Sequence, residues 1–239
     1  MSQPLAGPRR MPSLTTTTIR RTIVIGWRYL AMGTALSLLL TVVLIFASRK
    51  GGDAFLVTFP LEVPFFAILG STGGLMTFTS DRTKGVYEYL IAYGVPPRAI
   101  FRDGLLATAA MSGIIVALSL AVGLGGATAD GIALNVTFAK SIAYYTIPMS
   151  FAGGLFTATV GMIWASVSTP RTGINSPVGI APMIGIAPAI LVLIVAESAP
   201  SSEYYYITVG AALVIILAVV GLLAMSARLM GRERFLSPL

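Results

Sequence analysis

Long apolar stretches constrain this chain most, because a helix needs about 20 such residues to cross about 30 Å of hydrocarbon. Hydrophobicity along the chain predicts six spans, at Tyr29–Ser48, Ala54–Thr79, Leu105–Gly125, Ser141–Ala165, Val178–Ala196 and Tyr206–Ala227. These stretches lack the alternation of β-barrel strands. Hydrophobic residues make up 56% of the chain and charged residues only 10%, which excludes an ordinary soluble domain. We therefore predict an all-α, polytopic membrane protein with six transmembrane helices.

Prolines interrupt three of the predicted spans. The second span contains Pro60 and Pro64, and the fourth contains Pro148, so both are expected to tilt or kink. The fifth span is the most interrupted, by Pro182 and Pro188 with Pro177 just before it. Irregular backbone at membrane depth is tolerated where it is buried in protein or lines a cavity.

The residues before the first span have an amphipathic pattern. Ile19, Ile23 and Trp27 fall near one face of a helix, and Arg20 and Arg21 lie elsewhere on it. This pattern is typical of a helix that lies in the membrane interface. The alternative is that these residues extend the first span. The expected organisation is a tail with an interfacial helix at 1–28, followed by one transmembrane domain at 29–239.

The distribution of positive charge predicts the orientation. With the N-terminus inside, thirteen Lys and Arg residues fall on the inner side and only Arg49, Lys50 and Lys140 on the outer side. Such a bias places both termini in the cytoplasm. The net charge of +7 then reflects topology and contact with membrane lipids, so no nucleic-acid partner is expected.

Several classes of chemistry are disfavoured by composition. The chain has no cysteine and no histidine, so we expect neither a disulfide framework nor the commonest metal and acid–base sites. We predict no catalytic residues and no metal site. The three lysines, Lys50, Lys84 and Lys140, do not follow glycine, so a Walker A phosphate loop is absent.

The segment between the second and third spans is unusually charged for this chain. Residues 80–104 hold seven of its 25 charged residues and keep an apolar pattern of their own. Val86, Leu90 and Ile91 predict a short amphipathic helix at about 86–94. Gly94 is expected to cap this helix, and the following Pro96-Pro97 pair cannot continue it.

The same segment resembles the loop after the second span in ABC-2 type transporter permeases. "DRTKGVYEYLIAYGVPPRAIFRDGLLA" begins with charged residues, continues through a short helix and a turn, and meets a basic residue before the third span. Gly85, Glu88, Leu90, Val95 and Arg98 follow the family pattern. Val86 replaces its usual threonine, and Gly94 and Pro96 depart from the frequent Pro-Val-Ser turn.

The resemblance implies that this loop is a cytoplasmic coupling helix. It would dock on a separate ATP-binding subunit, which would hold the ATP and magnesium, while this chain holds no cofactor. The coupling residues would be Gly85, Val86, Tyr87, Glu88, Leu90 and Arg98. The alternative is a helix that merely lies at the lipid headgroup boundary, where tyrosine is common.

The family architecture also implies an assembly. Two permease chains, identical or homologous, would pair with two ATP-binding subunits in the plasma membrane, and export is the expected direction. Small residues such as the Gly70–Gly74 cluster are expected to allow close helix approach between the permeases. The substrate is not indicated by the sequence.

Glu62 is the one charged residue within the six predicted spans. An ionisable group at that depth is costly and usually faces a cavity or a partner, so Glu62 is a candidate for the substrate path. The alternative places it in the outer headgroup layer. Glu62 also keeps an ion- or proton-coupled carrier open as an alternative function. An intramembrane enzyme is a further alternative, although no paired carboxylates appear within a span.

Overall fold

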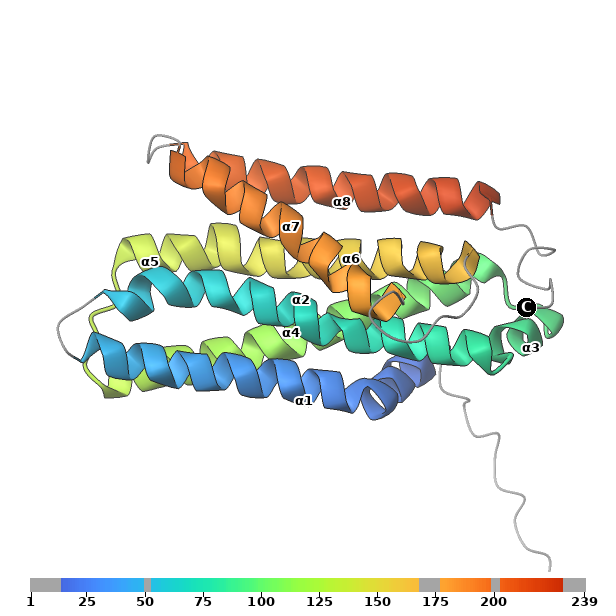
Figure 1. Cartoon of the computed structure of the whole chain (residues 1–239), viewed down its shortest axis with the longest axis horizontal. Coiled ribbons are helices and arrows are strands. Elements are labelled where there is room, and N and C mark those ends of the chain that lie inside the picture. Colours follow the sequence, from blue (N-terminus) through green and yellow to red (C-terminus); the bar gives the residue numbers. More distant parts are fainter. Residues whose placement is uncertain (1–13, 50–52, 168–176, 199–202, 230–239) are drawn as a thin grey trace, which may run out of the picture.

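The computed structural model describes residues 14–49, 53–167, 177–198 and 203–229, and every regular element in these ranges is a helix. The helices are α1 (Leu14–Ser48), α2 (Ala54–Thr83), α3 (Val86–Ala92), α4 (Pro97–Ala129), α5 (Val136–Ser141), α6 (Ile147–Val167), α7 (Pro177–Ser198) and α8 (Tyr204–Leu229). A π-helical turn, η1 (Ile142–Thr146), joins α5 to α6. The long helices lie side by side and α7 is inclined to them (Figure 1).

The helix lengths and compositions confirm a multi-pass helical membrane protein. Five helical segments among the described residues are long and apolar enough to span a membrane: α1, α2, α4, the continuous α5–η1–α6 segment and α8. The fifth predicted span falls on α7, whose described apolar part, Gly179–Val192, is shorter. The α7 helix packs between α2, α6 and α8.

The two ends of the bundle carry different elements. At one end, which we call the α3 end, α1 begins, α8 ends and α3 lies between α2 and α4 (Figure 1). At the opposite end, α1 stops and α2 begins (Figure 1). The α1 helix runs from Leu14 to Ser48 as one element, so the residues predicted to form the interfacial helix are continuous with the first predicted span.

The α2 helix continues through both of its prolines. Because Pro64 has no N–H group, the carbonyl of Pro60 lacks the donor that would normally lie four residues later. The hydroxyl of Thr146 donates to that carbonyl across 2.9 Å. Thr146 lies in η1, so a side chain from this π-helical turn satisfies a backbone carbonyl of α2 that lacks its usual donor.

Glycines let α2 approach α1 and α4 closely. A Cβ atom on Gly26 of α1 would lie 2.9 Å from the carbonyl oxygen of Gly73 in α2, too close for a side chain. Gly74 faces Thr108 of α4, and Gly70 faces Ile115 of the same helix. The expectation that the Gly70–Gly74 cluster joins two permease chains is therefore wrong: these glycines pack inside one chain.

Candidate functional site

Local backbone chemistry fixes the start of α3 and of α4. Gly85 precedes α3 with a φ angle of 69°, in the left-handed region that residues with a Cβ atom rarely adopt. Pro97 is the first residue of α4, where its missing N–H costs nothing, and Pro96 before it is extended. The residues between this turn and the third predicted span, which began at Leu105, therefore form the first turns of α4.

Gly94 ends α3 as the sequence predicted. Its φ angle is 86°, again in the left-handed region. The Gly94 N–H donates to the carbonyl of Ile91, and the Val95 N–H donates to that of Leu90, each across 3.0 Å. This is the Schellman pattern, which satisfies carbonyls at a helix end. Leu90 and Val95 both pack against the same core cluster, so the turn is tied to the body of the chain.

The inner face of α3 belongs to the core. Tyr87 is 6% exposed, and Ile91 is also buried. The Tyr87 ring lies 4.9 Å from the ring of Phe78 in α2, and Phe78 lies 5.3 Å from Phe101 in α4. Burial raises the pKa of the Tyr87 hydroxyl well above its usual value. Tyr87, a predicted partner contact, therefore faces its own chain and holds α3 against α2 and α4.

The outer face of α3 carries two other tyrosines. Tyr89 is 63% exposed and Tyr93 is 73% exposed. Their ring centres are 4.6 Å apart, and the Tyr89 hydroxyl donates to that of Tyr93 across 3.1 Å. This bond raises the pKa of Tyr89. Both lie in the predicted helix at 86–94, but neither was among the predicted coupling residues, although their spacing of four residues places them on one helical face.

The remaining predicted residues take different positions. Arg98 is exposed at the start of α4, while Val86, Glu88 and Leu90 are half-buried. Oε2 of Glu88 is buried and accepts no hydrogen bond among the described residues. The Glu88 charge interacts with that of Arg82 at the end of α2. Of the predicted coupling residues, Arg98 is thus the one presented most openly to a partner.

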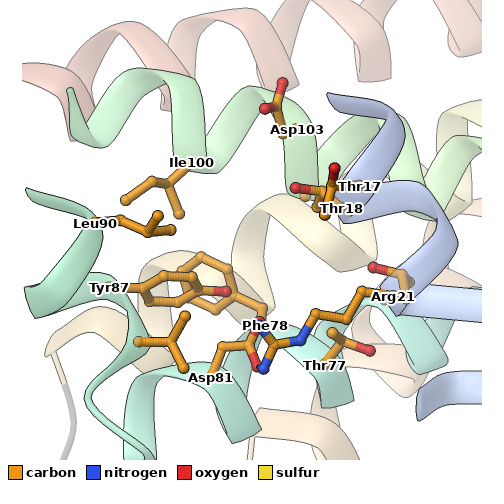
Figure 2. Close-up of a pocket in the computed structure, with 14 residues that line it drawn as sticks. Thr17, Thr18, Arg21, Thr77, Phe78, Asp81, Tyr87, Leu90, Ile100 and Asp103 are labelled. Atoms are coloured by element: carbon orange, nitrogen blue, oxygen red, sulfur yellow. The ribbon is translucent and has the colours of Figure 1, made fainter. Parts of the chain in front are cut away.

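A pocket of about 150 Å³ lies beneath α3, between α1, α2 and α4 (Figure 2). Tyr87 and Phe78 form an aromatic wall (Figure 2). Hydroxyl groups contribute to the lining, from Thr17, Thr18, Thr22 and Thr77. The apolar side chains of Val86, Leu90 and Ile100 also line it, so the surface of the pocket is mainly apolar.

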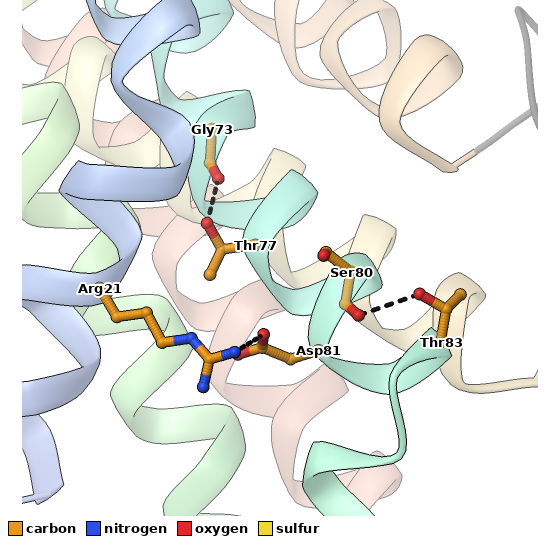
Figure 3. Close-up of polar contacts among 6 residues, drawn as sticks. All are labelled: Arg21, Gly73, Thr77, Ser80, Asp81 and Thr83. Carbon is orange, nitrogen blue, oxygen red and sulfur yellow. Dashed lines mark hydrogen bonds and ion pairs between the residues drawn. The ribbon is translucent and has the colours of Figure 1, made fainter.

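Two acidic residues at this pocket hold the start of α1. Arg21 of α1 donates to Oδ1 of Asp81 in α2 across 2.6 Å (Figure 3). Asp103 of α4 is buried, and its Oδ1 accepts from the hydroxyl of Thr15 across 3.0 Å and from Arg102 across 3.1 Å. Neither contact was predicted from the sequence, because Arg21 and Asp81 are 60 positions apart in the chain, and Thr15 and Asp103 are 88 apart.

Glu62 lies in the body of the bundle, away from α3. The residue is 6% exposed, and the hydroxyl of Thr41 in α1 donates to its Oε1 across 2.7 Å. Its Oε2 is buried without a hydrogen-bond partner among the described residues. Glu62 is therefore enclosed by helices and is not open to the bundle surface.

The candidate site is thus one end of a helical membrane bundle, where α3 presents two exposed tyrosines. The described residues include no cluster of three or more acidic side chains that could hold a metal ion. No protein-family model matches the chain, and no curated protein or solved structure is significantly similar to it.

Proposed function

We propose that this chain is the permease subunit of an ABC-2 type ABC transporter, which moves its substrate using ATP hydrolysed by a separate subunit. The observation that carries the proposal is α3: a short helix held between two long membrane helices, with Tyr89 and Tyr93 directed away from the bundle. The resemblance of residues 81–107 to the coupling loop of that family supports the same function.

In this proposal α3 transmits movement from the ATP-binding subunit to α2 and α4. Tyr87 and Ile91 anchor α3 in the core, while Gly94 and Pro97 fix its connection to α4. Because both connections are short, a displacement of α3 is passed to the long helices instead of being absorbed by the loop. Tyr89 and Tyr93 supply large, rigid surfaces with polar tips, which are common anchors at protein interfaces.

The proposed topology has six spans with both termini in the cytoplasm. The 22 residues of α7 extend about 33 Å, enough to cross about 30 Å of hydrocarbon as the fifth span. The positive-inside rule supports a cytoplasmic α3 end. Its described basic residues include Arg20, Arg21, Arg82, Lys84, Arg98 and Arg102, against Arg49 and Lys140 near the opposite end.

The proposed assembly contains two permease chains and two ATP-binding subunits, which bind ATP and magnesium, in the plasma membrane. Export is the proposed direction, with the path between the permeases. Since the glycines of α2 are used within the chain, the contact between permeases would use other faces. The exposed apolar side chains of α1 and α8 are available for lipid or for the second permease.

Co-purification tests this function. A tagged chain isolated from its own cells is expected to carry a subunit that contains a Walker A motif and hydrolyses ATP. Replacing Tyr89 and Tyr93 together by Ala should weaken this association at least tenfold, since losing one central aromatic anchor costs about 2 kcal/mol. The measurements are the amount of ATP-binding subunit recovered and the ATP hydrolysis of the complex.

Tyr206→Ala is the matched control, because Tyr206 is exposed at the opposite end of the bundle. It should leave the recovery and the ATP hydrolysis unchanged. Equal recovery of the subunit with the double variant and with the wild type would show that α3 is a boundary helix and not a coupling helix.

A further inference from the structure

The carboxyl group of Glu62 occupies an unusual environment. Glu62 lies eight residues beyond Ala54, the first residue of α2, which corresponds to about 12 Å along the helix axis. Its burial at 6% exposure places the carboxyl group between helices, within the second predicted span. Groups of this kind in membrane proteins commonly take part in ion or proton movement.

The immediate surroundings offer little to stabilise a negative charge. Thr41 supplies a single hydrogen bond, to Oε1, and Oε2 has no partner among the described residues. No described Lys or Arg forms an ion pair with Glu62. An ionised carboxylate enclosed with one neutral donor is strongly destabilised, whereas the protonated acid avoids most of that penalty.

Several other titratable groups at the end of the bundle where α1 stops and α2 begins are already engaged. Arg49 of α1 and Asp130 of α4 pair with each other. Lys140 of α5 lies over the ring of Tyr205 in α8. Tyr144 packs on Tyr205, and the hydroxyl of Tyr145 donates to the carbonyl of Ala189 in α7. Asp53, just before α2, is exposed. None of the described side chains of α6 and α7 is charged; Glu197, near the end of α7, is not among these side chains.

The backbone beside Glu62 is a weak point of α2. Neither Pro60 nor Pro64 can donate a backbone hydrogen bond, so this stretch of the helix lacks two of its usual links. The bond from Thr146 in η1 replaces one of them, but it depends on how α2 packs against another helix. A helix bends most readily at such positions, so movement of α2 relative to α1 can open the contact between Thr41 and Glu62.

We propose that Glu62 is a proton-binding site: its carboxyl group holds a proton while α1 and α2 are packed together and releases it when they separate. On release the O–H bond of the acid breaks, the electron pair stays on the carboxylate and the proton passes to an entering water molecule. Repacking reverses the step. The nearer route to water is the end of the bundle where α1 stops and α2 begins, so the proton exchanges with that side.

Infrared spectroscopy of the purified wild-type chain and of Glu62→Gln tests this directly. At neutral pH the wild type should show the carbonyl band of a protonated carboxylic acid, and Glu62→Gln should lose it. In heavy water the band should move to lower frequency as the helices open and the acid proton exchanges. Asp130→Asn is the control and should keep the band, because Asp130 is an exposed carboxylate paired with Arg49.

Thr41→Val gives a second readout if Glu62→Gln does not fold. Loss of the hydrogen bond to Oε1 should move the acid band to higher frequency without removing it. A wild-type spectrum without a protonated-acid band at neutral pH would overturn the proposal, as would a band that never exchanges in heavy water. The measurement needs no partner chain, so its outcome is independent of the ABC transporter proposal.

Discussion

At the scale of single residues, the ion pair between Arg49 and Asp130 fastens the end of α1 to the end of α4. Nε of Arg49 donates to Oδ2 of Asp130 across 2.9 Å, and Nη2 donates to Oδ1, so the pair is bidentate. The guanidinium group also lies 4.3 Å from the ring centre of Phe46. The hydrogen bonds and charge of Arg49 hold the pKa of Asp130 below its usual range.

This pairing predicts a pH-dependent effect of Asp130→Asn. A carboxyl group whose pKa is lowered by folding stabilises the folded state at pH values above its unfolded pKa, about 3.9. The contribution is lost as the pH falls through the lower, folded value. Because the pair is exposed, the substitution should lower the melting temperature at pH 7 by at most about 3 °C.

Thermal unfolding of the purified protein across this pH range measures the effect. The difference between the wild type and Asp130→Asn should shrink toward zero in acid. Asp53→Asn is the control, since Asp53 is exposed near the same end and its side chain makes no cap hydrogen bond to α2. A difference that stays constant from neutral pH into acid would refute the role of the pair.

At the scale of the helices, α3 has some features that the sequence predicts and others that it does not. Glycine and proline predicted where α3 ends, because their backbone preferences are local. One helical face carries Tyr87 and Ile91, and another carries Tyr89 and Tyr93, so both faces contain tyrosine. Which face turns inward depends on Phe78 and Phe101, on two other helices. The apolar pattern marks the face of Ile91 as the inner one, but the tyrosines themselves do not show which of them is buried.

Close packing of α1 on α2 predicts the effect of Gly26→Ala. The added Cβ atom would meet backbone atoms of Gly73 at 2.9–3.0 Å, and backbone cannot rotate away as a side chain can. Forcing two packed helices apart costs about 1–3 kcal/mol. Thermal unfolding should therefore show a clear loss of stability. The Gly26→Ala substitution should also weaken the contact between Thr41 and Glu62, which lie on the same two helices.

Gly125→Ala is the matched control for this substitution. Gly125 is also in a helix, α4, but a Cβ atom there would meet nothing within 4 Å. Alanine stabilises a helix relative to glycine by up to about 1 kcal/mol, so Gly125→Ala should be neutral or stabilising. A Gly26→Ala variant as stable as Gly125→Ala would contradict the close contact between α1 and α2.

At the scale of the whole molecule, α2 organises the bundle through its contacts with α1, α4, α6 and α7. One stretch of this helix carries Glu62 between its two prolines, and its end leads directly into α3. A displacement of α3 therefore reaches the Glu62 region along a single helix. This continuity gives a physical route by which events at the α3 end could alter helix packing at membrane depth.

The number of spans is a property of the whole chain, and it depends on whether α7 crosses the membrane. The chain has no cysteine, so single cysteines can be introduced as labels without background. With six spans and a cytoplasmic α3 end, a membrane-impermeant maleimide added to intact cells should label Tyr206→Cys, at the start of α8. Tyr89→Cys should react only after the membrane is permeabilised. Both positions are exposed in the structure.

Val136→Cys, at the exposed start of α5, provides the reference for the outer side. The chain reaches this position before α7, so it should be labelled in intact cells whether or not α7 spans the membrane. If α7 does not cross, Tyr206→Cys should instead behave like Tyr89→Cys and react only after permeabilisation. Labelling of Tyr89→Cys in intact cells, with protection of Val136→Cys, would reverse the orientation and remove α3 from the reach of a cytosolic ATP-binding subunit.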